Sequence, residues 1–250
     1  MSGRTALVTG GLGQLGRSIC ERLSQRGFKV VALDLPKSVG SEEAKDWSAR
    51  QAQPDGKGVA LIEVDVTDYE SCCRGVLQAE SEVGPADVLV NCAGITRDAT
   101  LKKLEKDAWD AVLTTNLDGV YNMSRQVVEG MVARGFGRIV NISSVNGVKG
   151  QFGQTNYSAA KAGMHGFTMA LAQEVARKGV TVNTVSPGYM STSLVEKIPA
   201  NILEEIVERI PVGRLGETRE IAALVAFLCS DEAAFITGAN HDINGGLHMH

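Results

Sequence analysis

The stretch Thr5-Ala6-Leu7-Val8-Thr9-Gly10-Gly11-Leu12-Gly13-Gln14-Leu15-Gly16 joins a short apolar run to a glycine-rich turn. The apolar run predicts a central strand that is buried on both faces. Residues 17 to 25 follow with apolar side chains at Ile19, Cys20 and Leu23, which predicts a helix. Such a turn lets the backbone approach a pyrophosphate, and the helix N-terminus stabilises its negative charge. Strand, turn and helix therefore indicate a dinucleotide-binding unit.

A second strand is predicted from Phe28 to Leu33, and it ends at Asp34. A carboxylate at this place accepts hydrogen bonds from both ribose hydroxyls of NAD and repels the 2′-phosphate of NADP. Neither Gly13 nor Leu35 adds a positive charge that would hold this phosphate. NADH is therefore the expected coenzyme, while the nearby cation Lys37 leaves NADPH as an open alternative.

Strands and helices alternate along the rest of the chain. Further strands are predicted at 59–64, 87–90, 138–143 and 180–185 and near 239–246, and helices at 42–52, 69–82, 104–134, from 157 onward and at 218–228. We expect the long helix to be interrupted near residues 114–116, and residues 190–211 to form a lid of short helices. The alternation predicts an α/β fold: a single Rossmann-type domain over residues 1–250, whose doubly wound parallel sheet of about seven strands carries helices on both faces.

Composition and charge exclude several classes of function. The chain has 250 residues, 44% of them hydrophobic, and a net charge of -4, which gives no indication of nucleic-acid binding. No apolar run approaches the roughly 20 residues that span a membrane, and the N-terminus leaves no room for a signal peptide. The five cysteines are expected to be reduced thiols, and the four histidines show no metal-ligand spacing. We expect a soluble, cytoplasmic protein without a metal site.

The second informative stretch runs from Ser144 to Lys161. If the residues after Asn156 are helical, Tyr157 and Lys161 lie four apart on one face of the helix. A cation near a phenol favours the phenolate, so we expect the pKa of Tyr157 to fall from its usual ~10 toward neutrality. The pair would then serve as a general acid/base for alcohol–ketone chemistry. The alternative is an ordinary pair on an exposed helix surface.

Context favours the catalytic interpretation. The glycine turn, Ser144 thirteen residues before Tyr157, Lys161 and Asn116 together resemble the short-chain dehydrogenase/reductase family, and the resemblance covers nearly the whole chain. It implies that Tyr157 donates the proton, Ser144 orients the carbonyl, Lys161 holds the nicotinamide ribose and Asn116 supports a water relay. The chain departs from the family pattern at Gln14, where a glycine is expected.

The resemblance also implies a set of cofactor-binding residues along the carboxyl ends of the strands. The full set is Gly10, Gly11, Leu12, Gly13, Gln14, Leu15, Gly16, Asp34, Asp65, Val66, Asn91, Ala93, Gly94, Tyr157, Lys161, Pro187, Gly188, Met190 and Thr192. Asp65 resembles the acid that contacts adenine, and Asn91 to Gly94 match the family's turn beside the ribose.

A closer resemblance, to acetoacetyl-CoA reductases of polyhydroxybutyrate synthesis, rests on residues 95–98, 150–156, 186–189 and 245–249. It implies reduction of an acyl-CoA thioester, acetoacetyl-CoA, to (R)-3-hydroxybutyryl-CoA. The implied substrate residues are Asp98, Ser144, Gln151, Phe152, Gln154, Tyr157, Gly188 and Tyr189. The two glutamines would bond the thioester and pantetheine amides, while Phe152 and Tyr189 would form apolar walls. Candidate cations for the CoA phosphates are Arg97, Lys102, Lys103 and Lys149.

Two other functions stay open at this point. A 3-oxoacyl-[acyl-carrier-protein] reductase would perform the same chemistry on a carrier-bound chain. A dinucleotide-sensing protein without turnover would keep the fold, but it would not need the proton donor Tyr157. The family is usually tetrameric, and the apolar residues between Val112 and Val132 and at the C-terminus permit such packing.

Overall fold

The computed structural model describes residues 3–51, 58–192 and 200–249. Seven parallel strands form one sheet in the order β3-β2-β1-β4-β5-β6-β7. The strands are β1 (Thr5–Thr9), β2 (Lys29–Asp34), β3 (Ala60–Glu63), β4 (Ala86–Asn91), β5 (Gly137–Ile142), β6 (Val180–Pro187) and β7 (Asn240–Ile243). The predicted fold class and strand number are confirmed.

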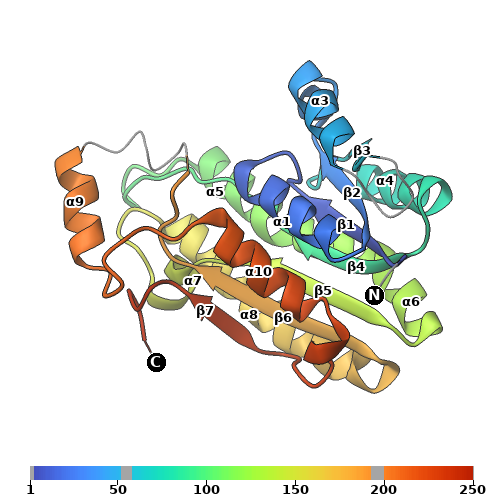
Figure 1. Cartoon of the computed structure of the whole chain (residues 1–250). Coiled ribbons are helices and arrows are strands. Elements are labelled where there is room, and N and C mark those ends of the chain that lie inside the picture. Colours follow the sequence, from blue (N-terminus) through green and yellow to red (C-terminus); the bar gives the residue numbers. More distant parts are fainter. Residues whose placement is uncertain (1–2, 52–57, 193–199, 250) are drawn as a thin grey trace.

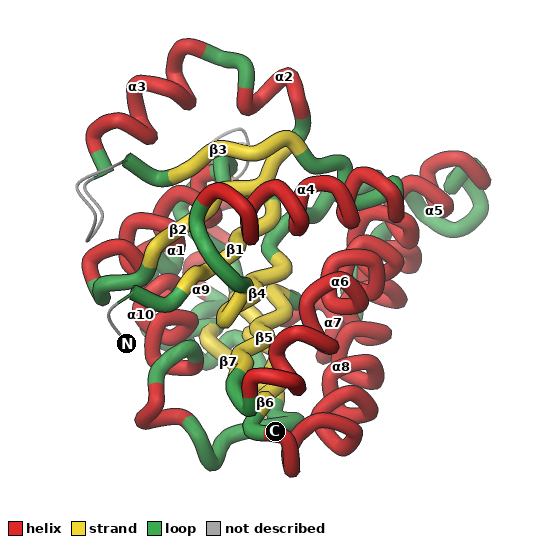
Figure 2. The backbone as a smooth tube through the Cα atoms, turned by 90° about the vertical axis from the view of Figure 1, so that its right-hand side faces the viewer, coloured by secondary structure: helices red, strands yellow, loops and turns green. Residues whose placement is uncertain are grey.

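Helices cover both faces of the sheet. On one side lie α1 (Gln14–Gln25) and α10 (Thr218–Leu228), and on the other α4 (Tyr69–Glu82), α6 (Gly119–Arg134) and α8 (Thr155–Val175), as Figure 2 shows from the side. The smaller helices are α2 (Pro36–Val39), α3 (Glu42–Arg50), α5 (Lys106–Leu113), α7 (Val145–Lys149) and α9 (Ala200–Glu208). In Figure 1, α7 and α9 lie beyond the arrowheads of β6 and β7, at the edge where ligands bind in such sheets.

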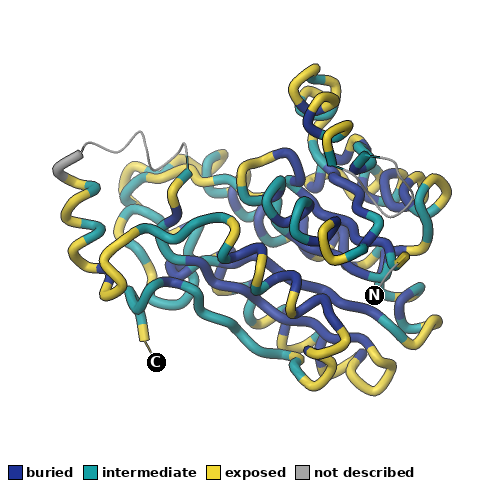
Figure 3. Tube along the Cα trace, viewed as in Figure 1, coloured by how far each residue is buried: buried dark blue, intermediate teal, exposed yellow. Residues whose placement is uncertain are grey.

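The core consists of two apolar clusters, one on each face of the sheet. Successive side chains of a strand alternate between faces, so Ala6 and Val8 pack toward α1, whereas Leu7 packs toward α4 and α6. The five inner strands are therefore largely buried on both faces, whereas the edge strands β3 and β7 are more open, and the exposed residues gather on the outer helices (Figure 3). This burial explains the continuous apolar runs within β1, β2 and β4.

The predicted break in the long helix is a π-helical turn. Residues Thr114–Asp118 form this turn between α5 and α6, and it contains the buried Asn116. The short helix α2 was not predicted. Of the predicted lid at 190–211, the structure gives α9 and the residues around Met190, while residues 193–199 lie outside the described residues.

Candidate active site

A large cavity lies along the carboxyl ends of β1, β2 and β4. Its volume is about 860 Å³, within the range of small-molecule and cofactor sites. Twelve predicted cofactor residues line it: Gly10, Leu12, Gly13, Gln14, Leu15, Gly16, Asp34, Asp65, Val66, Ala93, Gly94 and Thr192. The other predicted cofactor residues, which do not line this cavity, are Gly11, Asn91, Tyr157, Lys161, Pro187, Gly188 and Met190.

The glycine turn is shaped by close backbone contacts. Gly10 has a φ of +61°, and a Cβ at this residue would lie 2.8 Å from the Cα of Ala93. At Gly16 a Cβ would lie 2.1 Å from the Gly10 oxygen, so neither position accepts a side chain. Gly13 is the N-cap of α1, and Gln14, the departure from the family pattern, is its first helical residue and is exposed. The cavity is therefore bounded by backbone at a helix N-terminus, which fits a pyrophosphate.

Asp34 is held at the cavity wall by two backbone groups. Its carboxylate accepts hydrogen bonds from the N–H groups of Leu12 (3.0 Å) and Leu35 (2.9 Å). A carboxylate has about four acceptor sites, so sites remain for ribose hydroxyls. Lys37, the nearby cation that left NADPH as an alternative coenzyme, is exposed and does not line the cavity.

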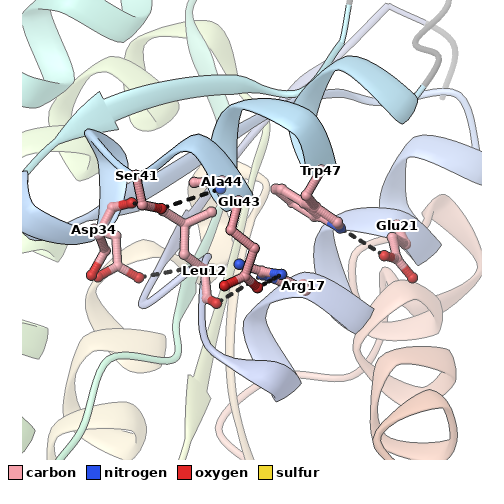
Figure 4. Close-up of polar contacts among 9 residues, drawn as sticks. Leu12, Arg17, Glu21, Asp34, Ser41, Glu43, Ala44 and Trp47 are labelled. Carbon is pink, nitrogen blue, oxygen red and sulfur yellow. Dashed lines mark hydrogen bonds and ion pairs between the residues drawn. The ribbon is translucent and has the colours of Figure 1, made fainter.

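One wall of the cavity comes from α2 and α3, which the sequence did not connect with the site. Ser38, Ser41 and Glu43 line it, and Figure 4 shows Ser41 and Glu43 beside Asp34 and Leu12. Arg17 joins this wall to α1 by an ion pair with Glu43 (2.7 Å) and a hydrogen bond to the Leu12 oxygen (2.9 Å). In the sequence, these wall residues lie in a polar stretch after Asp34, and no other feature of that stretch indicates that it reaches the cavity.

The buried Trp47 anchors α3 to the body of the domain. Its indole N–H donates to Glu21 on α1 at 2.8 Å, and the Arg17 guanidinium lies 5.4 Å from the ring centroid (Figure 4). Trp47 is 4% exposed, so α3 has one deeply packed side chain although most of its surface is open to solvent. The wall formed by α2 and α3 is therefore fixed to the helix that begins at the glycine turn.

Thr9 and Asn91 organise the turn after β4. The hydroxyl of Thr9 accepts hydrogen bonds from the N–H groups of Cys92 (3.0 Å) and Ala93 (3.1 Å). Asn91 is buried, and its amide donates to Asn141 (2.8 Å) in the neighbouring strand. The structure thus gives Asn91 a supporting position under the cavity wall, and adds Thr9, whose role the sequence analysis missed.

Tyr157 and Lys161 come together on α8. Lys161 is buried, its Nζ donates to the Ile142 oxygen at 2.8 Å, and it lies 5.5 Å from the centroid of the Tyr157 ring. A Cβ at Gly94 would lie 3.5 Å from this Nζ and 2.6 Å from Asn116 Oδ1. Lys161 and Asn116 therefore adjoin the cavity wall at Gly94, and the Tyr157 ring lies next to Lys161.

The expected fall in the pKa of Tyr157 is wrong for this structure. Burial raises the pKa of Tyr157 to about 12, and the hydrogen bond with Ser144 only partly opposes it. Burial also lowers the pKa of Lys161 to about 8. The same cause acts on both groups, because a dry environment favours the neutral form of each. Near pH 7 the phenol is protonated and can donate.

Ser144 and Asn116 complete the predicted catalytic group. Ser144 caps α7 by accepting from the Asn146 N–H at 3.1 Å, and its hydroxyl also forms the hydrogen bond with Tyr157. Asn116 donates to the oxygens of Ile95 and Val112, both at 2.9 Å. Its Oδ1 is buried and has no hydrogen-bond partner among the described residues, so it can accept from a further group.

The predicted substrate residues fall into two sets. Gln154 donates to Asp98 at 2.8 Å and accepts from Asn146 at 3.0 Å, so these side chains form one chain of hydrogen bonds. Gln151 and Tyr189 line a separate small hollow.

Two further substrate candidates differ in their surroundings. Phe152 is 87% exposed and lines neither described cavity. A Cβ at Gly188 would lie 2.8 Å from the Cα of Asn244, so the C-terminal turn packs directly on this glycine.

The buried Asn156 was also missed by the sequence analysis. Its amide donates to the Arg97 oxygen at 3.0 Å, while its oxygen accepts from the Tyr157 N–H at 2.8 Å. Ala99 N–H donates to the Gly153 oxygen at 2.9 Å in the same region. These contacts hold the loop containing Asp98 against the start of the catalytic helix.

No group of three potential metal ligands occurs in the part of the chain that the structure describes. Among these residues, no helix is long and apolar enough to cross a membrane.

Comparison with known proteins agrees with this arrangement. Residues 13–248 match the family model described as enoyl-(acyl carrier protein) reductase. The chain is 53% identical to the acetoacetyl-CoA reductase of Allochromatium vinosum over 99% of both chains, and 54% identical to that of Cupriavidus necator over the full length of both. It is 43% identical to a 3-oxoacyl-[acyl-carrier-protein] reductase of Vibrio harveyi, over 100% of this chain and 99% of that protein. With its parallel sheet, glycine turn and Tyr157–Lys161 pair, the chain belongs to the short-chain dehydrogenase/reductase family and is an NAD(P)-dependent oxidoreductase.

Proposed function

We propose that this protein reduces acetoacetyl-CoA to (R)-3-hydroxybutyryl-CoA, with NADH as the preferred coenzyme. The single observation that carries the proposal is the group formed by Ser144, Tyr157 and Lys161, in which the Lys161 ammonium lies beside the cavity wall at Gly94. Full-length identities of 53% and 54% to acetoacetyl-CoA reductases support the choice of substrate. The reaction fits a place in polyhydroxybutyrate synthesis in the cytoplasm.

The bound nicotinamide would supply the hydride. Tyr157 donates its phenolic proton to the carbonyl oxygen, since burial keeps the phenol protonated near neutral pH. The Ser144 hydroxyl orients the same oxygen and stabilises the negative charge that develops there. Lys161 would hold the nicotinamide ribose, and the unpartnered Oδ1 of Asn116 would accept from a water that returns the proton.

Preference for NADH is supported by the charges at the cavity wall. Asp34, Glu43 and Asp65 line the cavity, and among the described residues Glu43 forms an ion pair with Arg17, whereas the two aspartates form none. A 2′-phosphate placed beside Asp34 would meet an uncompensated carboxylate. NADPH would therefore bind more weakly than NADH.

The decisive experiment is a kinetic matrix of NADH and NADPH against acetoacetyl-CoA, longer 3-ketoacyl-CoAs and acetoacetyl carrier protein. We expect the highest kcat/KM with NADH and acetoacetyl-CoA. A higher value with the carrier thioester would favour a 3-oxoacyl-[acyl-carrier-protein] reductase, the function named for the Vibrio harveyi relative. Equal efficiency with NADH and NADPH would contradict the coenzyme assignment.

The Tyr157→Phe variant tests the catalytic role and excludes a purely sensing function. The variant loses only the phenolic oxygen, so turnover should fall by at least about a hundredfold while NADH still binds. Activity is measured by NADH oxidation and binding by fluorescence titration. Retention of more than about a tenth of the wild-type rate would refute the assignment of Tyr157 as the proton donor.

A further inference from the structure

A second, smaller hollow lies beside the residues predicted to bind the substrate. Its lining residues are Lys149, Gln151, Tyr189, Ile206, Arg209 and Leu247. The hollow measures about 20 Å³, enough for one water-sized group, so a larger ligand group would lie at its opening with a single atom inside it. Because Gln151 and Tyr189 are predicted substrate residues, a ligand group in this hollow would belong to the same substrate.

Two cations from distant parts of the chain meet at this hollow. Lys149 is the last residue of α7, and Arg209 follows the end of α9. Lys149 Nζ donates to the Gln151 side-chain oxygen at 2.9 Å and to the Gly150 oxygen at 3.2 Å, so its described partners are neutral. One of its three ammonium protons remains available.

Neither cation has a carboxylate partner among the described residues. Arg209 lies one turn after Glu205 and next to Glu208 in the sequence. Burial lowers the pKa of Lys149, and the charge of Arg209 lowers it further. An anion between the two would relieve this repulsion, and guanidinium and ammonium groups both bind phosphate.

We propose that Lys149 and Arg209 form a phosphate subsite that holds the phosphate of the substrate's phosphopantetheine arm. This inference rests on the proposed function, since it assumes a 3-ketoacyl thioester as substrate. The phosphopantetheine phosphate is common to CoA and to acyl carrier proteins, so the subsite serves either form.

The other candidate cations of the sequence are placed less favourably. Arg97 donates to its neighbour's carbonyl oxygen, that of Thr96, at 2.8 Å. Lys102 and Lys103 are exposed, and neither lines a described cavity. Of the four cations predicted to bind the CoA phosphates, only Lys149 lines a described hollow. Arg209 was not predicted, because it lies far from Lys149 in the sequence.

The test compares two substrates that differ by a single phosphate: acetoacetyl-phosphopantetheine and acetoacetyl-pantetheine. The wild-type enzyme should show a higher kcat/KM for the phosphorylated substrate. In the Lys149→Gln/Arg209→Gln double variant, the ratio of the two kcat/KM values should fall roughly tenfold, because two charge-assisted contacts are lost. A general disturbance of the site would lower both values and leave their ratio unchanged.

A matched control and the natural substrates complete the experiment. Lys178→Gln removes an exposed cation beyond the end of α8 and should leave the ratio at its wild-type value. Acetoacetyl-CoA and acetoacetyl carrier protein, measured in parallel, identify which natural thioester loses efficiency in the double variant. An unchanged ratio in an active double variant would overturn the subsite, whereas a wild-type enzyme that reduces none of these thioesters would overturn the proposed function instead.

Discussion

At the scale of single residues, burial gives Tyr157 and Lys161 their proton states. Burial raises the pKa of Tyr157 from 10.0 to about 12 and lowers the pKa of Lys161 from 10.5 to about 8. Both shifts favour the neutral form of the side chain. The kcat/KM for NADH, which reports groups of the free enzyme, should therefore fall as pH rises through about 8. The physical reason is that Lys161 loses its positive charge in this range, and with it a strong donor to the ribose.

NMR spectroscopy can test directly whether Lys161 is the group that titrates near pH 8. Carbon-13 NMR of labelled lysine should show a resonance that titrates near pH 8 in the wild type and is absent from Lys161→Met. A kinetic midpoint near 10.5, the ordinary value for lysine, would mean that burial does not control the titration.

The predicted preference for NADH over NADPH also depends on a single residue, Asp34. In Asp34→Asn, the side chain keeps an oxygen that can accept from the Leu12 or Leu35 N–H but loses its charge. The ratio of kcat/KM for NADPH to that for NADH should rise roughly tenfold, because repulsion of the 2′-phosphate is removed. Initial-rate kinetics with both coenzymes give the ratio.

Glu43→Gln is the matched control for Asp34→Asn. Glu43 lines the same cavity, but its charge is paired with Arg17. The glutamine still accepts a hydrogen bond that holds Arg17 in place, so the coenzyme ratio should change less than in Asp34→Asn. Equal effects of both substitutions would show that the ratio follows the net charge of the wall rather than the position of Asp34.

At the scale of elements, a buried hydrogen-bond chain ties α8 to the sheet. Ser143 donates to the Lys161 carbonyl oxygen at 2.9 Å, so its hydroxyl oxygen must accept from His165 Nε2 at 3.0 Å. This geometry requires the Nε2–H tautomer of His165. Burial lowers the pKa of His165, which keeps the ring neutral at pH 7.

His165→Leu should therefore reduce the free energy of unfolding by about 1–2 kcal/mol, since Ser143 loses a buried partner. Urea denaturation at pH 7 measures the loss. His165→Gln keeps an N–H donor at a similar place and should recover at least half of it. If both variants unfold like the wild type, the hydrogen-bond chain does not stabilise α8.

The elements also show how far the sequence could predict the site. The positions of Tyr157 and Lys161 follow from local spacing, and an interruption near Asn116 was visible as a run of poor helix formers. The π-helical turn itself depends on a contact between Asn116 and the distant Ile95 oxygen, which no local pattern contains. Likewise, Glu43 was missed because only the packing of Trp47 brings α3 to the cavity.

At the scale of the whole molecule, the strand order explains where the cavity lies. The chain moves outward from β1 to β3 in one direction, and from β4 to β7 in the other. The carboxyl ends of β1 and β4 therefore open into a crevice between oppositely directed crossovers. Alternation of strands and helices predicted the parallel sheet and a ligand site at the carboxyl ends of its strands, whereas the strand order was not predicted. The pKa of Tyr157 could not be predicted in the same way, since it depends on how deeply the crevice buries the phenol.

The exposed surface of α4 and α6 carries apolar side chains that could pack against another subunit in the expected homotetramer. Tyr69 and Tyr121 stack with ring centroids 6.5 Å apart, and they are 40% and 51% exposed. Leu77 on α4 is 61% exposed. Neighbouring exposed apolar side chains of this kind mark interaction surfaces, and Tyr121 lies within the range expected to pack across a two-fold axis.

If the expected tetramer packs through this surface, Tyr121→Glu should reduce it to a dimer. A charge in the middle of an apolar interface is costly, but on a free surface it changes little. Light scattering after size-exclusion chromatography gives the mass, and circular dichroism checks the fold. Lys45→Glu, an exposed charge change on α3, should leave the tetramer intact. If the Tyr121→Glu protein is still a tetramer, the subunits do not pack through this surface. If the wild type is a monomer, the expected tetramer is wrong.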